Sequence, residues 1–288
     1  MRYRKILLPL TDSRSGGAAL QLGLRLAALW QAHLAGVIVR LDARAAAPLS
    51  GDGLSASMIE DMMAAAERDS TQRARALASR YTTALDEAGI PLDPSPAGAI
   101  GPSASLSVLM GREEDILPAQ ARLADLTVLA QPDLASDAAS SDCLHNVLFE
   151  SGRAVLIAPP ALPVTLARRC CVAWNGTTEA SSALAAALPW LRQAGAVRLL
   201  HAQDYQRRGP GAAELLPYLA LHGITPDIVE FKPVNRDVGA GLLAAAAEFN
   251  ADFLAMGAYS HSRLRQMILG GVTRHVLESA RMPVLMSR

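Results

Sequence analysis

Cysteine is scarce in this chain, with three residues among 288, and the count is odd. This excludes a disulfide framework of the kind that small secreted domains use, and it fits a reducing compartment. The spacing of the cysteines matches no zinc site. Because Cys170 and Cys171 lie side by side in an apolar, strand-like run, we predict buried structural thiols there and no metal site.

Aromatic residues and net charge are also low. Aromatic side chains make up 4% of the chain against 51% hydrophobic residues, so the cores must be built mainly from Ala, Leu and Val. The 27 basic residues balance the 27 acidic ones. Because there is no overall field of one sign, the composition gives no support for nucleic acid or an acidic membrane surface as a partner.

No hydrophobic run approaches the length of a membrane span. The N-terminal segment MRYRKILLPL is basic and then apolar, but its apolar part is too short for a signal peptide and leads directly into the turn sequence TDSRSGG. We therefore predict a first strand there rather than a targeting segment. We expect a cytoplasmic protein that has no membrane partner.

The common catalytic and nucleotide-binding signatures are missing as well. The chain contains neither G-x-x-x-x-G-K-[ST] nor G-x-G-x-x-G, so neither a P-loop nor a dinucleotide fingerprint is present. It also lacks G-x-S-x-G and H-E-x-x-H, which mark a hydrolase nucleophile elbow and a zinc protease. The sequence therefore assigns no catalytic residue.

Apolar runs and helical patterns do alternate along the chain, and they do so twice. In the first half we predict strands at Lys5–Leu10, His33–Arg40, Leu126–Ala130 and Ala154–Ala158, and the poorly patterned Pro94–Gly101 allows one more. The helices expected there are Ser15–Gln31, Ala56–Ala88, Glu113–Leu123 with a kink or break at Pro118, and Leu144–Glu150. A polar loop is expected at Gln131–Asp142.

The plan repeats after the proline-rich linker Pro159–Pro163. The expected strands are Arg169–Trp174, Ala196–Ala202, Ile228–Phe231, Asp252–Met256 and Pro283–Met286. The expected helices are Ala180–Gln193, Gly211–His222, Val238–Asn250 and Val272–Ala280. This alternation predicts an α/β protein with two doubly wound, mostly parallel-sheet, Rossmann-like domains in tandem, at residues 1–160 and 165–288. The first strands of the two units align as KILLPLTDS with CCVAWNGTT.

The most informative stretch is Met256–Thr273, MGAYSHSRLRQMILGGVT. An apolar run ends at Gly257, a loop follows, and the pair Gly270-Gly271 precedes a helical pattern. Glycines let backbone N–H groups approach a ligand closely, and the first turn of a helix carries unpaired donors at its positive end. The order of strand, loop, glycine pair and helix therefore favours an anion site.

This spacing resembles the universal stress protein family, whose loop pattern is G-x2-G-x9-G-[S/T]. Gly257 and Gly270 match the first and third glycines, Ser260 stands at the second, and Gly271 replaces the Ser/Thr. The strand end MG and the closing segment MPVLM also look like the family. The resemblance implies an adenine nucleotide alpha hydrolase-like fold in both halves, although the specific motif occurs only in the second.

The resemblance further implies that the second half binds ATP, with Mg²⁺ accompanying it. The candidate cofactor-binding residues are Ala173, Asn175, Ala202, Gly257, Tyr259, Ser260, Gly270, Gly271, Val272 and Thr273. Three positions depart from the family pattern. Asn175 stands where an acidic residue is usual, Ser260 resists the positive φ open to glycine, and Gly271 keeps the backbone donor but loses a hydroxyl.

The first half is less well equipped. Asp12 keeps the acidic position after the first strand, but the segment AQPDLASDAASSDCLHNVLFESG contains no G-x2-G, no Gly-Ser pair and no Lys or Arg. We therefore expect no nucleotide in the first half, which would serve as a structural partner of the second.

These features predict a universal stress response protein of the tandem type, acting as a non-catalytic, ligand-binding regulatory module. Two alternatives stay open. One is a slow ATPase, with Asn175 and His261 as the available polar groups. The other is an interaction or structural protein with a decayed site or a non-nucleotide ligand. Family members usually pair through their last strands, so the chain either makes this pairing internally, as a pseudo-dimer of its domains, or forms a homodimer.

Overall fold

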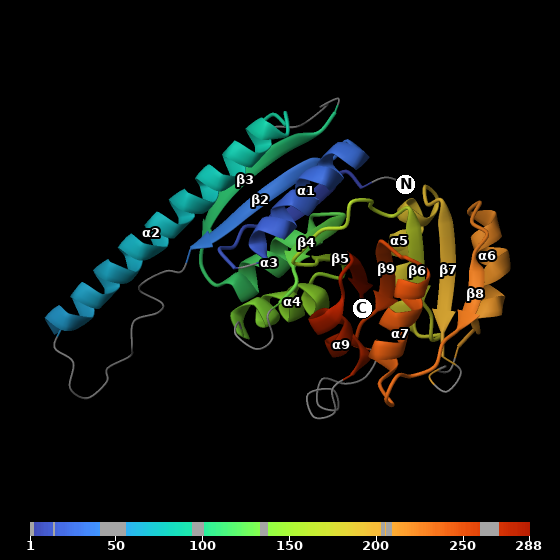
Figure 1. Cartoon of the computed structure of the whole chain (residues 1–288). Helices are drawn as coiled ribbons and strands as arrows, with labels where there is room; N and C mark the ends of the chain where they lie inside the picture. The colour runs from blue at the N-terminus through green and yellow to red at the C-terminus, as the bar shows by residue number, and fades with distance from the viewer. Residues whose placement is uncertain are drawn as a thin grey trace.

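The computed structural model describes residues 3–13, 15–40, 56–93, 101–132, 138–202, 205, 209–259 and 271–288. Its centre is a sheet of ten strands in the order β3-β2-β1-β4-β5-β10-β9-β6-β7-β8 (Figure 1). The strands are β1 (Lys5–Pro9), β2 (His33–Arg40), β3 (Ser103–Met110), β4 (Leu126–Ala130), β5 (Val155–Ala158), β6 (Arg169–Ala173), β7 (Ala196–His201), β8 (Asp227–Glu230), β9 (Phe253–Gly257) and β10 (Val284–Ser287).

Each half of the sheet is parallel, and the two halves have the same strand order read outward from the centre. β1 lies between β2 and β4, and β6 lies between β7 and β9, so the two first strands occupy equivalent places. The halves join where β5 and β10 run antiparallel, with Leu285 opposite Leu156. The doubly wound, mostly parallel fold predicted from the sequence is confirmed.

Nine helical segments among the described residues cover the two faces of the sheet. They are α1 (Gly16–Trp30), α2 (Ala56–Glu87), α3 (Glu113–Arg122), α4 (Ala138–Glu150), α5 (Thr178–Leu191), the 3₁₀ turn η2 (Ala212–Glu214), α6 (Leu215–Leu221), α7 (Val238–Glu248) and α9 (Val272–Ser279). Buried residues of α1, α2, α5 and α6 share one core, and those of α3, α4, α7 and α9 share the other. One end of α2 extends past the sheet (Figure 1).

The apolar strands follow from burial on both faces. β1 reads KILLP and β4 reads LTVLA, and nearly every residue in both is buried, as expected for parallel strands covered by helices on each side. Among the described residues, no helix is long and apolar enough to cross a membrane.

An aromatic cluster closes the core where the halves meet. The indole of Trp190 in α5 lies edge-on to Trp30 of α1, with ring centroids 5.1 Å apart, and stacks on Phe253 of β9 at 4.9 Å. Its Nε1–H donates to the hydroxyl of Tyr3 at 3.0 Å. Although aromatic residues are few, several of them are gathered at this one place.

Two local predictions need correction, and one strand was not predicted. The strand allowed within Pro94–Gly101 falls on residues 94–100, which lie outside the described residues. The unpredicted strand is β3 at Ser103–Met110, where the serine-rich sequence SASLSVLM hides the apolar alternation. α4 begins at Ala138, six residues before the predicted start at Leu144. The polar composition of this stretch indicated a loop, but Ala and Ser are both compatible with a helix. α3 continues through Pro118 to Arg122, so a break there is wrong.

The cysteines in the apolar run are buried, as predicted. Cys170 and Cys171 in β6 are both 0% exposed. Burial raises the pKa of Cys171 to about 12 and raises that of Cys170 well above its ordinary value. Because the thiolate is the reactive form, neither thiol is set up for redox chemistry or metal binding.

His33 gives a pH-dependent prediction for the first half. Its ring nitrogens lie 2.9 Å from the hydroxyl of Ser103 and 2.8 Å from that of Ser105, on neighbouring β3. Burial lowers the pKa of His33 below its usual 6.5, the charge of Lys5 lowers it further, and Asp93 opposes the shift. The neutral ring is therefore the form that the folded state favours.

Because the pKa of His33 is lower in the folded state, its contribution to stability is fully present above about pH 6.5, the unfolded pKa. The contribution is lost as the pH falls through the folded-state pKa. We expect the free energy of unfolding to fall with acidification from pH 7 to pH 5, and His33→Asn to remove part of this slope. Urea unfolding at several pH values measures it. An identical slope in the variant would show that His33 does not contribute.

Candidate functional site

The candidate site lies at the topological switch point of the second half, where the chain connections from neighbouring strands run in opposite directions across the sheet. β6 is followed through α5 by β7 on one side, whereas β9, on the other side of β6, leads to α9 and β10. α5 packs on one face of the sheet and α9 on the other. In open α/β sheets this divergence at the carboxyl ends of the strands leaves the crevice in which ligands bind. Ala173 ends β6 opposite Met256 of β9.

The turn after β6 uses its polar groups internally. Oδ1 of Asn175 accepts a hydrogen bond from the hydroxyl of Thr177 at 2.9 Å and faces its N–H at 3.3 Å. The hydroxyl of Thr177 in turn accepts from the N–H of Ala180 at 3.2 Å and caps α5. The Asn175 oxygen is thus committed to this turn, while its amide NH₂ has no hydrogen bond to any described residue.

Gly257, the first glycine of the loop pattern, is pressed against the start of α5. A Cβ atom at this position would lie 2.5 Å from the backbone N of Ala180 and 2.7 Å from the carbonyl carbon of Glu179. Real Cβ atoms do not approach backbone this closely, so only glycine fits without a shift. Gly257 therefore brings the end of β9 into direct contact with the first turn of α5.

Tyr259 follows the end of β9 and contacts two helices. Its backbone has a left-handed φ of 56°, which is uncommon for a residue with a side chain. Its N–H lies 3.4 Å from the hydroxyl of Thr273 in α9, and its phenol oxygen lies 2.6 Å from Nε2 of His145 in α4. Its ring also contacts that of Phe149, with centroids 5.2 Å apart. Tyr259 thus joins the candidate site to the first half.

The start of α9 has the character of an anion site. Gly271 is the N-cap, with no side-chain capping bond, and the first turn contains no acidic residue. A Cβ at Gly271 would meet no atom of a described residue within 4 Å. Val272 and Thr273 follow in the first turn, and the Thr273 side chain is buried against Tyr259. Uncapped N–H groups at a helix N-terminus favour a negative charge.

The charged residues further along α9 are paired elsewhere. Arg274 bonds to Glu278 at 2.8 Å on the exposed surface. Nδ1 of His275 lies 2.7 Å from Oδ2 of Asp237, whose Oδ1 caps α7. Neither side chain is directed by its contacts toward the candidate site, so the charge stabilisation that the described part of α9 offers there comes from backbone donors.

A short segment after β7 covers the other side of the site. Trp174 is 4% exposed, and its Nε1–H donates to the carbonyl of Pro210 at 2.8 Å. Gly209 crosses so close to Gly176 that an added Cβ would lie 2.0 Å from the Gly176 carbonyl oxygen. Ala202, at the end of β7, is buried at 6% exposure. Trp174 therefore belongs to the packed core rather than to an open wall.

The structure brings Ala173, Asn175, Gly257, Tyr259 and the first turn of α9 to one edge of the sheet. Ser260 and Gly270 lie outside the described residues, as does His261. Sequence reasoning missed three contacts: Tyr259 with His145, Trp174 with Pro210, and His275 with Asp237. Each joins residues far apart in the chain, and no local spacing reveals such pairs.

The equivalent place in the first half is differently built. Asp12 forms a two-bond ion pair with Arg73 of α2, at 2.9 Å for both bonds. This hydrogen bonding lowers the pKa of Asp12 below its usual value. After β4, Nε2–H of Gln131 donates to the carbonyl of Leu277 in α9 at 2.6 Å. These polar groups serve contacts within the chain.

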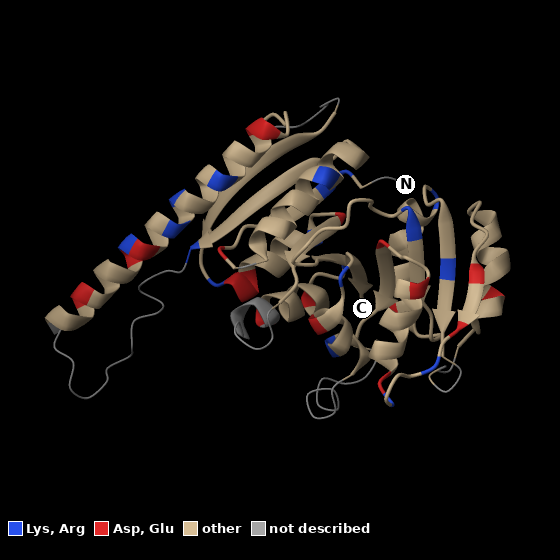
Figure 2. Cartoon of the chain, viewed as in Figure 1, with Lys and Arg blue, Asp and Glu red and all other residues tan. Residues whose placement is uncertain are grey.

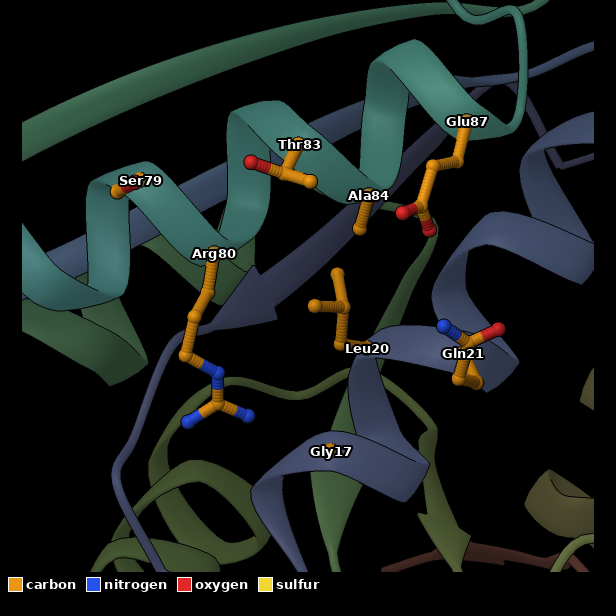
Figure 3. A pocket seen from close by; sticks show the side chains of 8 residues that line it. All are labelled: Gly17, Leu20, Gln21, Ser79, Arg80, Thr83, Ala84 and Glu87. Atoms are coloured by element: carbon orange, nitrogen blue, oxygen red, sulfur yellow. The ribbon is translucent and has the colours of Figure 1, made fainter.

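A groove of about 490 Å³ lies away from the candidate site, between α1 and α2 (Figure 3). Its lining residues are Gly17, Leu20, Gln21, Ser79, Arg80, Thr83, Ala84 and Glu87. Arg80 and Glu87 stand toward opposite ends of the α2 wall, and Leu20 and Ala84 lie between them (Figure 3). None of these lining residues belongs to the candidate site at the ends of β6 and β9.

Comparison with known proteins adds a family and a set of similar folds. Residues 167–288 match the model of the universal stress protein family. No curated protein matches the chain. A solved universal stress protein from Archaeoglobus fulgidus DSM 4304 has a TM-score of 0.70 and 18% identity, covering 99% of this chain and 96% of that one.

Other solved structures share less of the geometry. A functionally unknown protein from Pseudomonas aeruginosa PAO1 has a TM-score of 0.53 and 17% identity, covering 99% of this chain and 92% of that one. The match to a universal stress protein solved in complex with cAMP covers 56% of this chain and 100% of the solved chain, with 22% identity and a TM-score of 0.30. At such identities, the full-length matches establish a common fold.

Proposed function

We propose that the second half of the chain, in which residues 167–288 match the universal stress protein family model, binds ATP or another adenine nucleotide at the carboxyl ends of β6 and β9. The observation that carries the proposal is the start of α9. Its first turn has no side-chain cap and no acidic side chain, and α9 is the next described helix after β9, which ends at Gly257. A polyphosphate supplies the negative charge that such a helix end favours.

The remaining residues can be assigned to parts of the ligand. In this proposal the phosphates lie against the N–H groups of Gly271, Val272 and Thr273, together with Gly270 and Ser260 from the sequence motif. In this proposal the amide NH₂ of Asn175 donates to a ribose hydroxyl, since the bonds to Thr177 use only the Asn175 oxygen. The backbone around Ala173 and Ala202 faces the adenine, and Tyr259 borders the loop.

Mg²⁺ is proposed to enter with the phosphates rather than to wait in a protein site. Among the described residues, no group of three or more His, Cys, Asp or Glu side chains gathers to hold a metal ion. Phosphate oxygens are the ligands that Mg²⁺ commonly uses in nucleotide sites. Affinity for the nucleotide should therefore vary with magnesium only through the charge of the ligand.

The ligand is proposed to act as a regulator rather than a substrate. Tyr259, which follows β9, contacts His145 and Phe149 of α4, so in this proposal a change at Tyr259 reaches the first half directly. This link suits a stress response protein in which nucleotide sets the relation between the two halves or the choice of partner.

The division of the chain at residues 160 and 165 is likewise proposed to separate two domains that pair as an internal pseudo-dimer. The antiparallel contact of β5 with β10 supports this, because it relates the last strands of the two halves in a self-complementary way. In the proposal the first domain supplies support and the second the ligand.

Calorimetric titration with ATP, with and without Mg²⁺, tests the proposed site through Gly271. We expect binding in the micromolar range by the wild-type protein and a loss of about tenfold to a hundredfold in Gly271→Asp, since the new carboxylate opposes phosphate. Asp and Asn are equally good N-caps, so Gly271→Asn is the matched control with the same shape and stability.

Retention of affinity in Gly271→Asn together with loss in Gly271→Asp supports the site. Equal affinity in all three proteins would place the nucleotide elsewhere. Absence of binding by the wild-type protein would favour the decayed site, and mass spectrometry of the denatured protein would then search for another ligand. Phosphate release during titration would favour the slow ATPase.

A further inference from the structure

The groove between α1 and α2 lies in the first half of the chain, outside the site proposed for nucleotide (Figure 3). Its volume of about 490 Å³ is in the range of pockets that hold small organic ligands. Every residue that lines it belongs to the described part of the chain, so the chemistry of the whole lining can be stated.

The middle of the groove is apolar and its borders are polar. Leu20 of α1 and Ala84 of α2 are 6% and 8% exposed, and their side chains face each other (Figure 3). The exposed side chains of Gln21, Ser79 and Thr83 also line the groove and have no hydrogen bond to a described residue. Because amide and hydroxyl groups both donate and accept, this lining suits a ligand that carries amide groups beside an apolar side chain.

Arg80 supplies a positive charge at one end of the groove. One of its terminal nitrogens lies 3.7 Å from the place that a Cβ on Gly17 would take, at the start of α1. Arg80 has no hydrogen bond or ion pair with a described residue. Its charge also acts on Asp12, but both oxygens of that carboxylate are bonded to Arg73.

The backbone beside Arg80 also favours a carboxylate. The N–H of Gly17 has no acceptor among the described residues, and the first turn of α1 contains no acidic side chain. A guanidinium and a backbone N–H together bind a carboxylate through charge-assisted hydrogen bonds.

Glu87 supplies the opposite charge at the other end (Figure 3). It is the last residue of α2, it is exposed, and the last turn of this helix contains no basic residue. Both signs of charge occur along α2, whereas α1 contributes no charged side chain to the groove (Figure 2). The end of a helix is negative, as Glu87 is, so this end of the groove favours an ammonium group.

The two charged ends are separated by a defined length. Glu87 follows Arg80 by seven residues, about two turns, so both side chains leave the same side of α2. At about 1.5 Å per residue, their separation along the helix is roughly 10 Å. An extended chain of about three residues has the same length, at about 3.4 Å per residue.

We propose that this groove binds a short peptide of about three residues with an unblocked amine and an unblocked carboxylate. The C-terminal carboxylate lies on Arg80 and the N–H of Gly17, and the N-terminal ammonium lies on Glu87. The central side chain is apolar and packs on Leu20 and Ala84. A fatty acid would place methylene groups against Glu87, and a nucleotide would bring a second negative charge toward it, so neither matches both ends.

Calorimetric titration of the full chain with the tripeptide Ala-Leu-Ala tests the proposal, without nucleotide present. We expect a dissociation constant on the order of 0.1–1 mM. The C-terminally amidated and the N-acetylated forms of the same peptide should each bind about threefold to tenfold more weakly, since each loses one ionic contact at an exposed site.

Two variants locate the ends of the peptide. Arg80→Gln should bind the unblocked and the amidated peptide equally, and Glu87→Gln should bind the unblocked and the acetylated peptide equally. Arg75→Gln is the matched control, because Arg75 is exposed on the same helix and does not line the groove. It should keep the wild-type affinities. All three variants replace exposed side chains, so their circular-dichroism melting curves should stay close to that of the wild-type protein.

Three results would overturn the proposal. The first is an absence of binding by the wild-type protein at millimolar peptide. The second is equal wild-type affinity for the unblocked and both blocked peptides, which would mean that no charged end is recognised. The third is discrimination between the peptides that persists in both Arg80→Gln and Glu87→Gln, because the peptide would then bind at another surface.

Discussion

Replacing Trp190 by alanine is expected to lower the free energy of unfolding by about 3–5 kcal/mol, the cost of removing a large aromatic side chain from a packed core. Trp190 is 1% exposed and contacts Trp30 and Tyr3 in the first half and Phe253 in the second. The alanine variant leaves a cavity between the halves, and it leaves the Tyr3 hydroxyl without its indole donor.

Chemical denaturation followed by circular dichroism measures this loss. Leu221→Ala is a suitable control, because Leu221 is 85% exposed and its truncation should change the stability by little. A single cooperative transition shifted to lower denaturant would show that the halves share one core. A loss below about 1 kcal/mol would contradict the packing described for Trp190.

Gly257→Ala is expected to cost about 1–3 kcal/mol of unfolding free energy, whereas Gly271→Ala should change it by much less. The two glycines belong to the same sequence motif, but they meet different surroundings. A Cβ at Gly257 would lie 2.5 Å from the Ala180 backbone, and this backbone cannot move without lifting α5 from β9. At Gly271 the same atom would meet no described residue within 4 Å, and its φ of −97° suits any residue.

Thermal and urea unfolding of the two alanine variants, side by side, gives the comparison. Each variant is the control for the other, because both replace a glycine by alanine at a position of the same motif. Equal losses at both positions would mean that Gly257 is not held by steric contact with α5. A larger loss at Gly257 would assign the first motif glycine to packing and leave the glycine at the helix start available for a ligand.

Most of the fold follows from patterns that operate over a few residues. Runs such as KILLP and FLAMG predict buried strands, because a strand of a parallel sheet is covered on both faces and is therefore apolar along its whole length. β3 escaped prediction because four serines or alanines dilute its alternation, and the long contact with β2 decides its state. The pairing of β3 with β2 therefore outweighs the weak β propensity of the β3 sequence.

The sequence predicts which strand end and helix start form the candidate site, but it does not predict the contacts of the residues there. Gly257 and Gly271 define a strand end and a helix start by their spacing, and parallel topology then brings Asn175 to the same edge. The spacing does not reveal that the Asn175 oxygen bonds to Thr177, or that Tyr259 reaches His145 across 114 residues. The Asn175 contact is a local turn that the spacing of the motif does not specify. The Tyr259 contact depends on how the two halves pack, which no motif of one half encodes.

The position of β10 in the sheet has a consequence for the order of synthesis. β10 fills the place between β5 and β9, yet it follows β5 in the chain by more than a hundred residues. At ordinary elongation rates, β5 therefore waits on the order of ten seconds for its neighbour to leave the ribosome. During that time β5 is an unpaired edge strand of only four residues, so it offers few backbone groups for pairing with another nascent chain.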